Sequence, residues 1–446
     1  MTTVPGLIIA APSSGSGKTV ITLGLLRALR DHGTRISGAK AGPDYIDPAF
    51  HSAATGRTAH NLDPWGMRPG TVAALIEHSA RDTDLIIAEG VMGLFDGANL
   101  PGRPDAGSTA DLAAQTGWPV VLVIDAAKQA GSVAALVSGF ANHRADVKVA
   151  GVILNRVGSE SHEQVLRDAI SMTCPGLPIL AAVRRDPALA LPERHLGLIQ
   201  AGEHDTLESF IATAGRTLSQ AVDLDALISL ARPTHFVRSS SDDGLQIPIL
   251  GQRIAVARDD AFAFSYASVL NGWRASGSEI SFFSPLADEA PAPDADAIYL
   301  AGGYPELYAA QLSRASRFRQ GLQDAAARKA AILGECGGYM VLGKGLIDAE
   351  GKCHEMTGLL PVETSFAARK LHLGYRVVET VSTTVLGSKG KQFRGHEFHY
   401  ASITSEADGT PLFDTANARG DHLGPVGMTN GNVSGSFIHL IDQVAT

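Results

Sequence analysis

The sequence predicts an α/β protein of two domains, each built around a parallel β-sheet. Short apolar runs alternate with Ala- and Leu-rich stretches of helical length in both halves of the 446-residue chain. This alternation is typical of parallel sheets that helices cover on both faces. A polar stretch rich in Ser, Asp and Gly interrupts it, as linkers do. We therefore expect a first domain at residues 1–232, a linker at 233–250 and a second domain at 251–446.

The expected strands are the most apolar of these runs, because short apolar runs between turn signals fit buried strands. In the first half they are residues 6–11, 85–88, 120–124, 149–154 and 179–183, and helical stretches include 20–29 and 133–140. In the second half they are residues 253–257, 280–283, 297–300 and 331–333, with β-rich segments around 375–378 and 433–438.

The composition is that of a soluble globular protein, with 45% hydrophobic and 19% charged residues. A formal net charge of −9 argues against a general nucleic-acid binder, which needs a concentrated basic face. No apolar run reaches the roughly 20 residues of a membrane span. The three cysteines are an odd and sparse set, which disfavours a disulfide framework, and they include no CxxC pair, which disfavours a thiolate metal site. We expect a cytoplasmic protein with neither nucleic acid nor membrane as a partner.

A phosphate-binding loop is expected at residues 12–19, Pro-Ser-Ser-Gly-Ser-Gly-Lys-Thr, between a strand and a helix. In such loops glycines let backbone N–H groups face phosphate, the lysine reaches the terminal phosphates and the threonine binds Mg²⁺. Pro12 departs from the strict pattern, so a plain Gly/Ser turn is the alternative. Ser13 stands where partition-type ATPases carry a second lysine, which disfavours that class. The residues expected to bind ATP are Gly15, Ser16, Gly17, Lys18 and Thr19.

Asn155 directly follows the expected strand 149–154. Its amide is a candidate contact for the adenine edge of ATP, and a turn-forming asparagine is the equal alternative.

Two acidic segments, residues 40–48 and 89–97, fall where the carboxyl ends of strands are expected, the edge at which parallel sheets bind ligands, and the second directly follows the expected strand 85–88. Asp44 and Glu89, with Thr19, are the candidate Mg²⁺ ligands, because Mg²⁺ prefers one or two carboxylates beside phosphates and water. Asp47 and Asp96 lie in the same two Gly-flanked segments and are candidates for positioning a substrate or a second metal. For each acid, a loop cap or a solvated charge is the alternative.

Cys336 stands between small residues after an apolar strand, in the order strand, sharp turn, helix. Such a turn exposes a nucleophile, and the helix N-terminus is expected to lower the thiol pKa. Gly337 and Gly303 are the candidate oxyanion donors through their backbone N–H groups. A cysteine nucleophile needs a base, and His439, expected to follow an apolar strand, is the candidate. A buried structural cysteine is the alternative.

Four segments together resemble one known family: residues 42–48 (Gly-Pro-Asp-Tyr-Ile-Asp-Pro), 89–97 (Glu-Gly-Val-Met-Gly-Leu-Phe-Asp-Gly), 302–306 (Gly-Gly-Tyr-Pro-Glu) and 334–340 (Gly-Glu-Cys-Gly-Gly-Tyr-Met). They are similar to the cobyrinic or hydrogenobyrinic acid a,c-diamide synthases of cobalamin biosynthesis. The resemblance implies a dethiobiotin-synthetase-like first domain and a class I-type glutamine amidotransferase second domain. It also implies ATP, Mg²⁺, L-glutamine and a corrinoid, hydrogenobyrinic or cobyrinic acid, as cofactors and substrates.

The resemblance also implies roles for single residues. Cys336 would be the nucleophile and His439 its base. Tyr45 would join the acids that line the part of the site that binds the corrinoid and Mg²⁺. Ordinary class I amidotransferases carry a glutamate two residues after the histidine, and here that position is Ile441. We therefore expect a Cys–His dyad.

The expected mechanism activates the a and c acetate carboxylates as acyl phosphates, which ammonia from glutamine then converts to amides. Alternatives within this chemistry are a nickel-sirohydrochlorin a,c-diamide synthase and a cobyric acid synthase. An alternative from another class is a P-loop partition or switch ATPase. A homodimer is an open alternative for the assembly.

Overall fold

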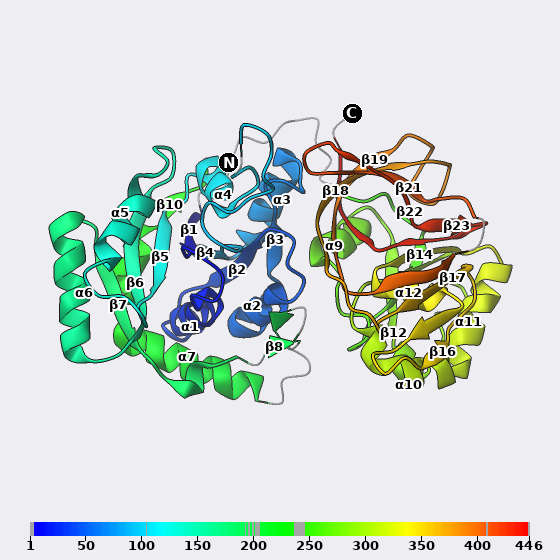
Figure 1. Cartoon of the computed structure of the whole chain (residues 1–446), viewed down its shortest axis with the longest axis horizontal. Coiled ribbons are helices and arrows are strands. Elements are labelled where there is room, and N and C mark those ends of the chain that lie inside the picture. The colour runs from blue at the N-terminus through cyan, green and yellow to red at the C-terminus, as the bar shows by residue number, and fades with distance from the viewer. Residues whose placement is uncertain are drawn as a thin grey trace. The chain divides into compact units, whose positions relative to one another are not determined.

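The computed structural model describes residues 4–103, 105–191, 193–194, 197–198, 200, 206–235, 246–406 and 409–444. The chain separates into two compact units (Figure 1). The first comprises Met1–Trp65 and Pro69–Asp242, and the second comprises Gly66–Arg68 and Asp243–Thr446. Much of the expected linker, residues 236–245, lies outside the described residues, and the predicted domain bounds stay a prediction.

The first unit is built on an eight-stranded sheet whose main path runs β3-β2-β4-β1-β5-β6-β7 with all neighbours parallel. Its strands are β1 Pro5–Ala10, β2 Ile36–Ala41, β3 His60–Leu62, β4 Leu85–Glu89, β5 Val120–Asp125, β6 Val149–Val157 and β7 Ile179–Arg184. The short β10, Arg232–Pro233, pairs antiparallel with β1. A separate two-stranded ribbon joins β8 Glu193–Arg194 to β9 Gly197–Leu198.

Helices lie on both sides of this sheet (Figure 1), which explains why β1, β4 and β5 are almost continuously buried. They are α1 Lys18–Asp31, α2 Asp47–Thr55, α3 Pro69–Ser79, α4 Thr109–Thr116, α5 Val133–Asn142, α6 Glu160–Thr173, α7 Leu207–Ala221 and α8 Leu224–Leu230, with a short 3₁₀ turn η1 at Pro187–Leu189. Helix α1 approaches α7 closely at Gly24, where a Cβ would lie 2.9 Å from the carbonyl oxygen of Ala214.

The second unit contains a six-stranded sheet of order β12-β11-β13-β14-β24-β23, parallel except for the β23–β24 pair. Its strands are β11 Arg253–Ala257, β12 Glu279–Phe283, β13 Ala297–Leu300, β14 Ala331–Glu335, β23 Met428–Asn430 and β24 Val433–Ser436. The helices are α9 Ala267–Ala275, α10 Ala309–Arg314, α11 Ser316–Ala327 and α12 Gly337–Leu342, with 3₁₀ turns η3 Pro285–Ala287 and η4 Pro305–Tyr308.

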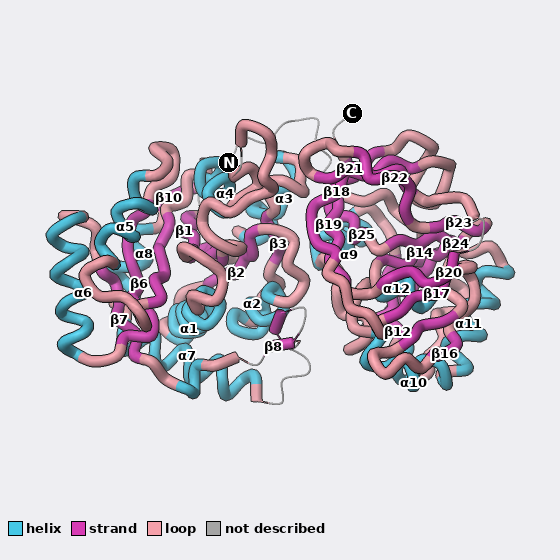
Figure 2. Tube along the Cα trace, in the orientation of Figure 1, coloured by secondary structure: helices cyan, strands magenta, loops and turns pink. Residues whose placement is uncertain are grey.

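Two further sheets complete the second unit, and Figure 2 shows β18, β19, β21 and β22 grouped apart from β12 and β14. A five-stranded antiparallel sheet has the order β22-β21-β18-β19-β25, with β18 His372–Thr380, β19 Gln392–His399, β21 Phe413–Asn417, β22 His422–Val426 and β25 Ile438–Gln443. A four-stranded sheet has the order β16-β15-β17-β20, with β15 Gly345–Ile347, β16 Cys353–Glu355, β17 Val362–Ser365 and β20 Ser402–Glu406.

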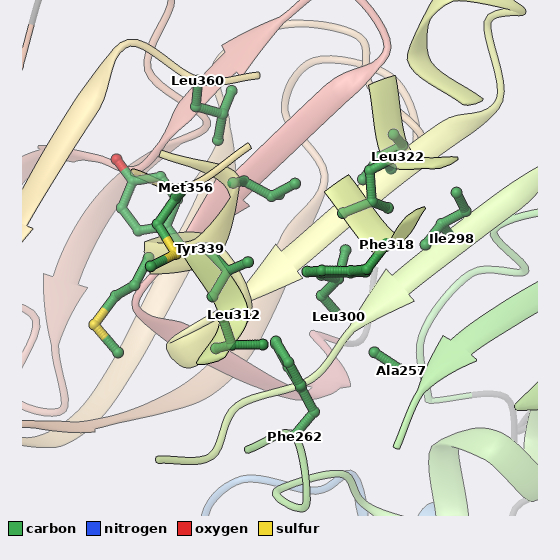
Figure 3. Packing of buried hydrophobic residues seen from close by; sticks show 14 of the residues in the cluster. Ala257, Phe262, Ile298, Leu300, Leu312, Phe318, Leu322, Tyr339, Met356 and Leu360 are labelled. Carbon is green, nitrogen blue, oxygen red and sulfur yellow. The ribbon is translucent and has the colours of Figure 1, made fainter. Parts of the chain in front are cut away.

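The core of the second unit lies between the six-stranded sheet and its helices. Leu300 of β13, Phe318 and Leu322 of α11 and Tyr339 of α12 are fully buried in one cluster (Figure 3). Burying a side chain such as Phe318 contributes roughly 1.5–3 kcal/mol relative to leaving it exposed. This packing holds β14 and α12 rigidly, and the turn between them carries Cys336.

The structure confirms the predicted α/β class with a parallel sheet in the first half. The β-rich segment 433–438 contains β24, which ends at Ser436, and the first residue of β25, which begins at Ile438 in another sheet. The expectation that His439 follows an apolar strand is wrong, because His439 lies inside β25. The sequence prediction also did not include β2, whose residues Ile-Ser-Gly-Ala-Lys-Ala are less apolar than the other strands although all six are buried.

None of the helices among the described residues is long and apolar enough to cross a lipid bilayer.

Candidate active sites

The loop between β1 and α1 has the backbone that a phosphate site needs. Gly15 and Gly17 adopt φ values of 75° and 88°, in the left-handed region that favours glycine. Gly17 is the N-cap of α1, so the first N–H groups of this helix face the loop. The amide of Asn155 donates to the carbonyl oxygen of Ser16 at 3.0 Å. Asn155 thus braces the loop, and its predicted adenine contact stays a prediction.

Lys18 and Thr19 point into a buried polar centre. The ammonium of Lys18 donates to the carbonyl oxygens of Met92 at 2.5 Å and Ser13 at 3.3 Å. Burial, followed by the nearby charge of Lys40, lowers the pKa of Lys18 to about 8. The hydroxyl of Thr19 donates to Glu89 Oε1 at 2.6 Å. This hydrogen bond places the side chain of Thr19 against the end of β4, while the magnesium site predicted for the two residues stays a prediction.

Glu89 is the centre of a buried network that sequence reasoning did not find. Its Oε1 atom also accepts from Lys40 at 2.9 Å, and its Oε2 atom lies 2.7 Å from Nε2 of His51. Burial alone would raise the pKa of Glu89, but Lys40 and the hydrogen bonds from His51 and Thr19 outweigh it and hold the pKa below its ordinary value. Glu89 is therefore a carboxylate at neutral pH.

Lys40 also pairs with Asp47 at 2.5 Å, and both side chains are almost fully buried. Burial opposes the charge of Lys40, but Asp47 and Glu89 outweigh it and raise the pKa of Lys40. Only part of this cluster left a signal in the sequence, because Asp47 and His51 are four residues apart, the spacing of one helix face.

The other predicted rim residues have local partners. Asp44 Oδ1 accepts from the backbone N–H groups of Ile46 and Asp47 at 2.8 and 2.9 Å, so it caps the start of α2. Asp96 accepts from Gly93 N–H at 2.8 Å and closes a turn. Tyr45, which follows Asp44 in the chain, is half-buried. These contacts fix the loops, while the predicted metal and substrate roles of the residues stay predictions.

The donors at this edge of the sheet fit a magnesium ion. A threonine hydroxyl and an ionised glutamate lie 2.6 Å apart at the start of the helix that follows the phosphate loop. Hard oxygen donors next to a phosphate site are the environment that Mg²⁺ prefers.

In the second unit, Cys336 lies in the sharp turn between β14 and α12. Its backbone has φ 47° and ψ −106°, an unusual conformation for a residue with a side chain. Such strain costs about 1–3 kcal/mol and is concentrated at functional sites. The turn is held by a 2.8 Å hydrogen bond from Cys336 N–H to the carbonyl oxygen of Ser436.

Cys336 and His439 meet at Gly302, just beyond the end of β13. A Cβ at Gly302 would lie 2.3 Å from Cε1 of His439 and 3.2 Å from Cβ of Cys336. A Cβ at Gly337 would lie 3.1 Å from the backbone nitrogen of Gly303. The structure thus brings together all four residues predicted for a cysteine-based site, and glycine at 302 leaves the room in which the thiol and the imidazole approach each other.

Both reactive groups are buried and are neutral at pH 7. Burial, together with Glu306, raises the pKa of Cys336, against a hydrogen bond from Gly337 N–H. The N–H of Gly337, the first residue of α12, does lower the pKa of Cys336 as expected for a helix N-terminus, but burial outweighs it and the net pKa is raised. Burial and the neighbouring His396 and His399 lower the pKa of His439 to about 3. A neutral imidazole is the form that can accept the proton of a thiol.

A histidine cluster lies on the neighbouring strands β18 and β19. Atoms of His372, Glu397 and His399 come within 4.8 Å of one another. However, the rings of His372 and His399 are stacked 4.7 Å apart with an angle of 5°. A metal ion lies in the plane of each imidazole that binds it, so parallel stacked rings point past a shared ion. The guanidinium of Arg376 also forms an ion pair with Glu397, with Nη2 and Oε2 2.6 Å apart. This arrangement is that of a packed ion pair.

Comparisons with known proteins find a family for each half of the chain. Residues 7–199 match the family described as CobQ/CobB/MinD/ParA nucleotide binding domain, and residues 253–444 match the CobB/CobQ-like glutamine amidotransferase domain. Relatives named hydrogenobyrinate a,c-diamide synthase align over nearly the whole chain. The protein from Brucella anthropi is 56% identical with 98% of both chains covered. The proteins from Rhizobium meliloti and Mesorhizobium japonicum are 55% and 50% identical, with 98% and 99% of this chain and 99% and 100% of theirs covered.

Proposed function

Because the chain belongs to the hydrogenobyrinate a,c-diamide synthase family, we propose that it converts the a and c acetate carboxylates of hydrogenobyrinic acid to amides. The protein is an enzyme, a carbon–nitrogen ligase that uses glutamine as its nitrogen donor. It has a nucleotide-binding domain, and we assign ATP as the nucleotide. The observation that best supports the proposal is the presence of a phosphate loop and a strained cysteine beside a histidine in one chain.

The proposed division of labour follows the two units. The synthetase domain spans residues 1–232 and the glutaminase domain spans 251–446, joined by a linker at 233–250. The nucleotide-binding family also includes partition-type ATPases, so the first domain alone does not separate the two classes. The amidotransferase match and the Cys336–His439 arrangement favour the ligase.

The first step in the synthetase domain is the activation of a carboxylate. A free carboxylate is a poor electrophile, so its oxygen attacks the γ-phosphate of ATP to form an acyl phosphate and ADP. Lys18 leaves the carbonyl oxygens of Ser13 and Met92 and binds the terminal phosphates. Thr19, Glu89 and Asp44 would hold Mg²⁺, which when bound neutralises phosphate charge. Lys40 keeps Glu89 ionised. The positive charge of Lys40 therefore lies next to the proposed magnesium site.

Tyr45, Asp47 and Asp96 are the proposed corrinoid contacts of this domain, and Asn155 the proposed adenine contact. Asp47 is the first residue of α2 and pairs with Lys40. It would therefore act as much by fixing the start of that helix as by direct contact with the corrinoid. Ammonia then attacks the acyl carbon, the phosphate leaves with the electrons of the bond that breaks, and the phosphate takes up the proton that the new amide nitrogen loses.

The glutaminase domain supplies that ammonia. His439 accepts the thiol proton of Cys336, and the sulfur attacks the amide carbon of glutamine. The N–H groups of Gly303 and Gly337 would donate to the oxygen on which negative charge develops. Ammonia leaves with the proton returned by His439, and water hydrolyses the thioester to glutamate.

Mass spectrometry of products from ATP, Mg²⁺, glutamine and candidate tetrapyrroles tests the proposal. We expect two amide groups to be added to hydrogenobyrinic acid. Cobyrinic acid and nickel-sirohydrochlorin serve as the comparison substrates. Amidation of nickel-sirohydrochlorin alone, or of none of the three, would contradict the assigned substrate.

A further inference from the structure

The proposed nucleophile and its base belong to different sheets of the second unit. Cys336 follows β14 in the six-stranded sheet, whereas His439 lies in β25 at the edge of the five-stranded sheet. The chain changes sheets at Phe437, between β24 and β25. Among the described strands, β14 pairs with β13 and β24, and β25 pairs with β19, so the two catalytic elements share no ladder of backbone hydrogen bonds.

One buried carboxylate spans this junction. Glu335, the last residue of β14, is 4% exposed. Its Oε1 atom accepts from the backbone N–H of Leu440 at 3.1 Å, and its Oε2 atom accepts from the hydroxyl of Tyr299 at 2.7 Å. Glu335 immediately precedes Cys336 in the chain, and Leu440 immediately follows His439. The carboxylate therefore joins the neighbours of the two reactive residues.

The second anchor of this carboxylate is itself rigid. Tyr299 lies in β13, and its ring packs edge-on against Trp273 with centroids 5.4 Å apart. The indole of Trp273 donates to the carbonyl oxygens of Ile247 and Pro248, both at 3.1 Å. Movement of the Glu335 carboxylate would therefore break a chain of buried contacts.

We propose that Glu335 is a positioning residue of the glutaminase, which fixes the distance between Cys336 and His439 by holding the backbone of β25 through Leu440. The inference rests on the proposed function of Cys336 and His439. At Ile441, where ordinary class I amidotransferases carry a glutamate, the chain has a buried apolar side chain. Glu335 instead precedes the nucleophile Cys336 in the chain and holds the backbone N–H of Leu440, the residue after the base His439.

The cost of burying this carboxylate supports a positioning role. Burial raises the pKa of Glu335 to about 7, against the hydrogen bonds from Tyr299 and Leu440. An apolar side chain of similar size would avoid this desolvation, whereas a fully bonded buried polar group specifies one arrangement of the elements that it joins. Small displacements matter here, because a shift of about 1 Å between reacting groups can cost on the order of 10²-fold in rate.

The test compares Glu335→Gln with Glu335→Leu in the full-length enzyme. Glutamine keeps both bonds, since its carbonyl can accept from Leu440 N–H and its amide can donate to the oxygen of Tyr299. Leucine removes both. For Glu335→Leu we expect the kcat of glutamine hydrolysis to fall on the order of 10²-fold with little change in KM. Glu335→Gln should restore most of the loss.

Calorimetry of the second unit reports whether that unit is folded in each variant, and ammonia-dependent synthesis reports on the first unit. If Glu335→Leu loses the transition of the second unit, Tyr299→Phe decides, because it removes a single anchor and should lower kcat by a smaller factor. The matched control is Asp296→Ala. Asp296 holds two backbone N–H groups, of Gln252 and Arg253, at the opposite end of the same sheet, and its loss should leave glutamine hydrolysis unchanged.

An unchanged kcat of glutamine hydrolysis in Glu335→Leu would overturn the inference. If Glu335→Leu is not folded, an unchanged kcat in Tyr299→Phe would overturn it. Equal losses in Glu335→Gln and Glu335→Leu would also overturn it, because they would assign the effect to the charge and not to the hydrogen bonds. Failure of the proposed function is distinguishable. In that case the unmodified enzyme lacks glutaminase activity, or Cys336→Ser retains it.

Discussion

Thr19 donates its hydroxyl hydrogen to Glu89 across 2.6 Å, which links the helix after the phosphate loop to the end of β4. The same glutamate bonds to Lys40 and His51, so one buried carboxylate connects β4 to α1, β2 and α2 of the first unit. Glu89 thus has a structural role in addition to its proposed chemical role, and substitutions of Glu89 should separate the two.

Replacing Glu89 with Gln should impair the synthetase and leave the glutaminase intact. The neutral amide cannot balance Lys40 or support Mg²⁺, so amide formation should fall on the order of 10²-fold with either glutamine or ammonia. The first unit should lose about 3 kcal/mol of unfolding free energy, because a buried cation loses a partner. Product formation and calorimetry measure the two effects. Asp84→Asn, which breaks a solvent-exposed pair with Arg35, should change neither.

The affinity of the free enzyme for ATP should depend on the protonation of Lys18. Burial and Lys40 lower the pKa of Lys18 to about 8. Bound phosphate favours the charged form and raises that pKa. Below about pH 8 the lysine is already charged, and affinity should not depend on its titration. Above it, binding must take up a proton, so the Kd for ATP should rise up to about tenfold per pH unit.

Isothermal titration with ATP across this pH range measures that dependence. Lys148→Met, which removes an exposed lysine of the same unit, should keep the slope. A Kd that stays constant from about pH 8 to about pH 9.5 would show that Lys18 does not bind the phosphates as a cation.

Replacing Asp442 with Ala should destabilise the second unit. Asp442 is fully buried and accepts hydrogen bonds from the backbone N–H and the guanidinium of Arg68 at 2.8–3.2 Å. Arg68 is far away in sequence but belongs to this unit. Removing one partner of a buried pair costs about 3 kcal/mol, or roughly 6–12 °C for a domain of this size.

Differential scanning calorimetry would detect this shift in the transition of the second unit. Asp414→Ala, which breaks an exposed pair with His422, is the control and should leave the transition in place. An unchanged transition in the Asp442 variant would mean that the Arg68 pair contributes nothing to stability.

Much of the candidate chemistry could be predicted from sequence because it is encoded in local runs. The glycines, Lys18 and Thr19 of the phosphate loop are consecutive, and Cys336 is marked by the small residues around it. Each motif needs only its own turn and helix to take shape, so a single stretch of sequence carries the information.

The remainder depends on contacts between residues far apart in the chain. Lys40 reaches Glu89 across 49 positions, and Glu335 reaches Leu440 across 105. Neither pair has a spacing that periodicity could reveal. The change of sheet at Phe437 was hidden for a related reason, since two short apolar strands with one residue between them look like one strand.

The most direct test of the central claim is the activity of Cys336→Ser with two nitrogen donors. We measure amide formation on hydrogenobyrinic acid with ATP and Mg²⁺, once with glutamine and once with a high concentration of ammonium salt. The account predicts that the variant forms no amide from glutamine and keeps ammonia-dependent synthesis near the level of the unmodified enzyme. Synthesis from glutamine at an undiminished rate would contradict it.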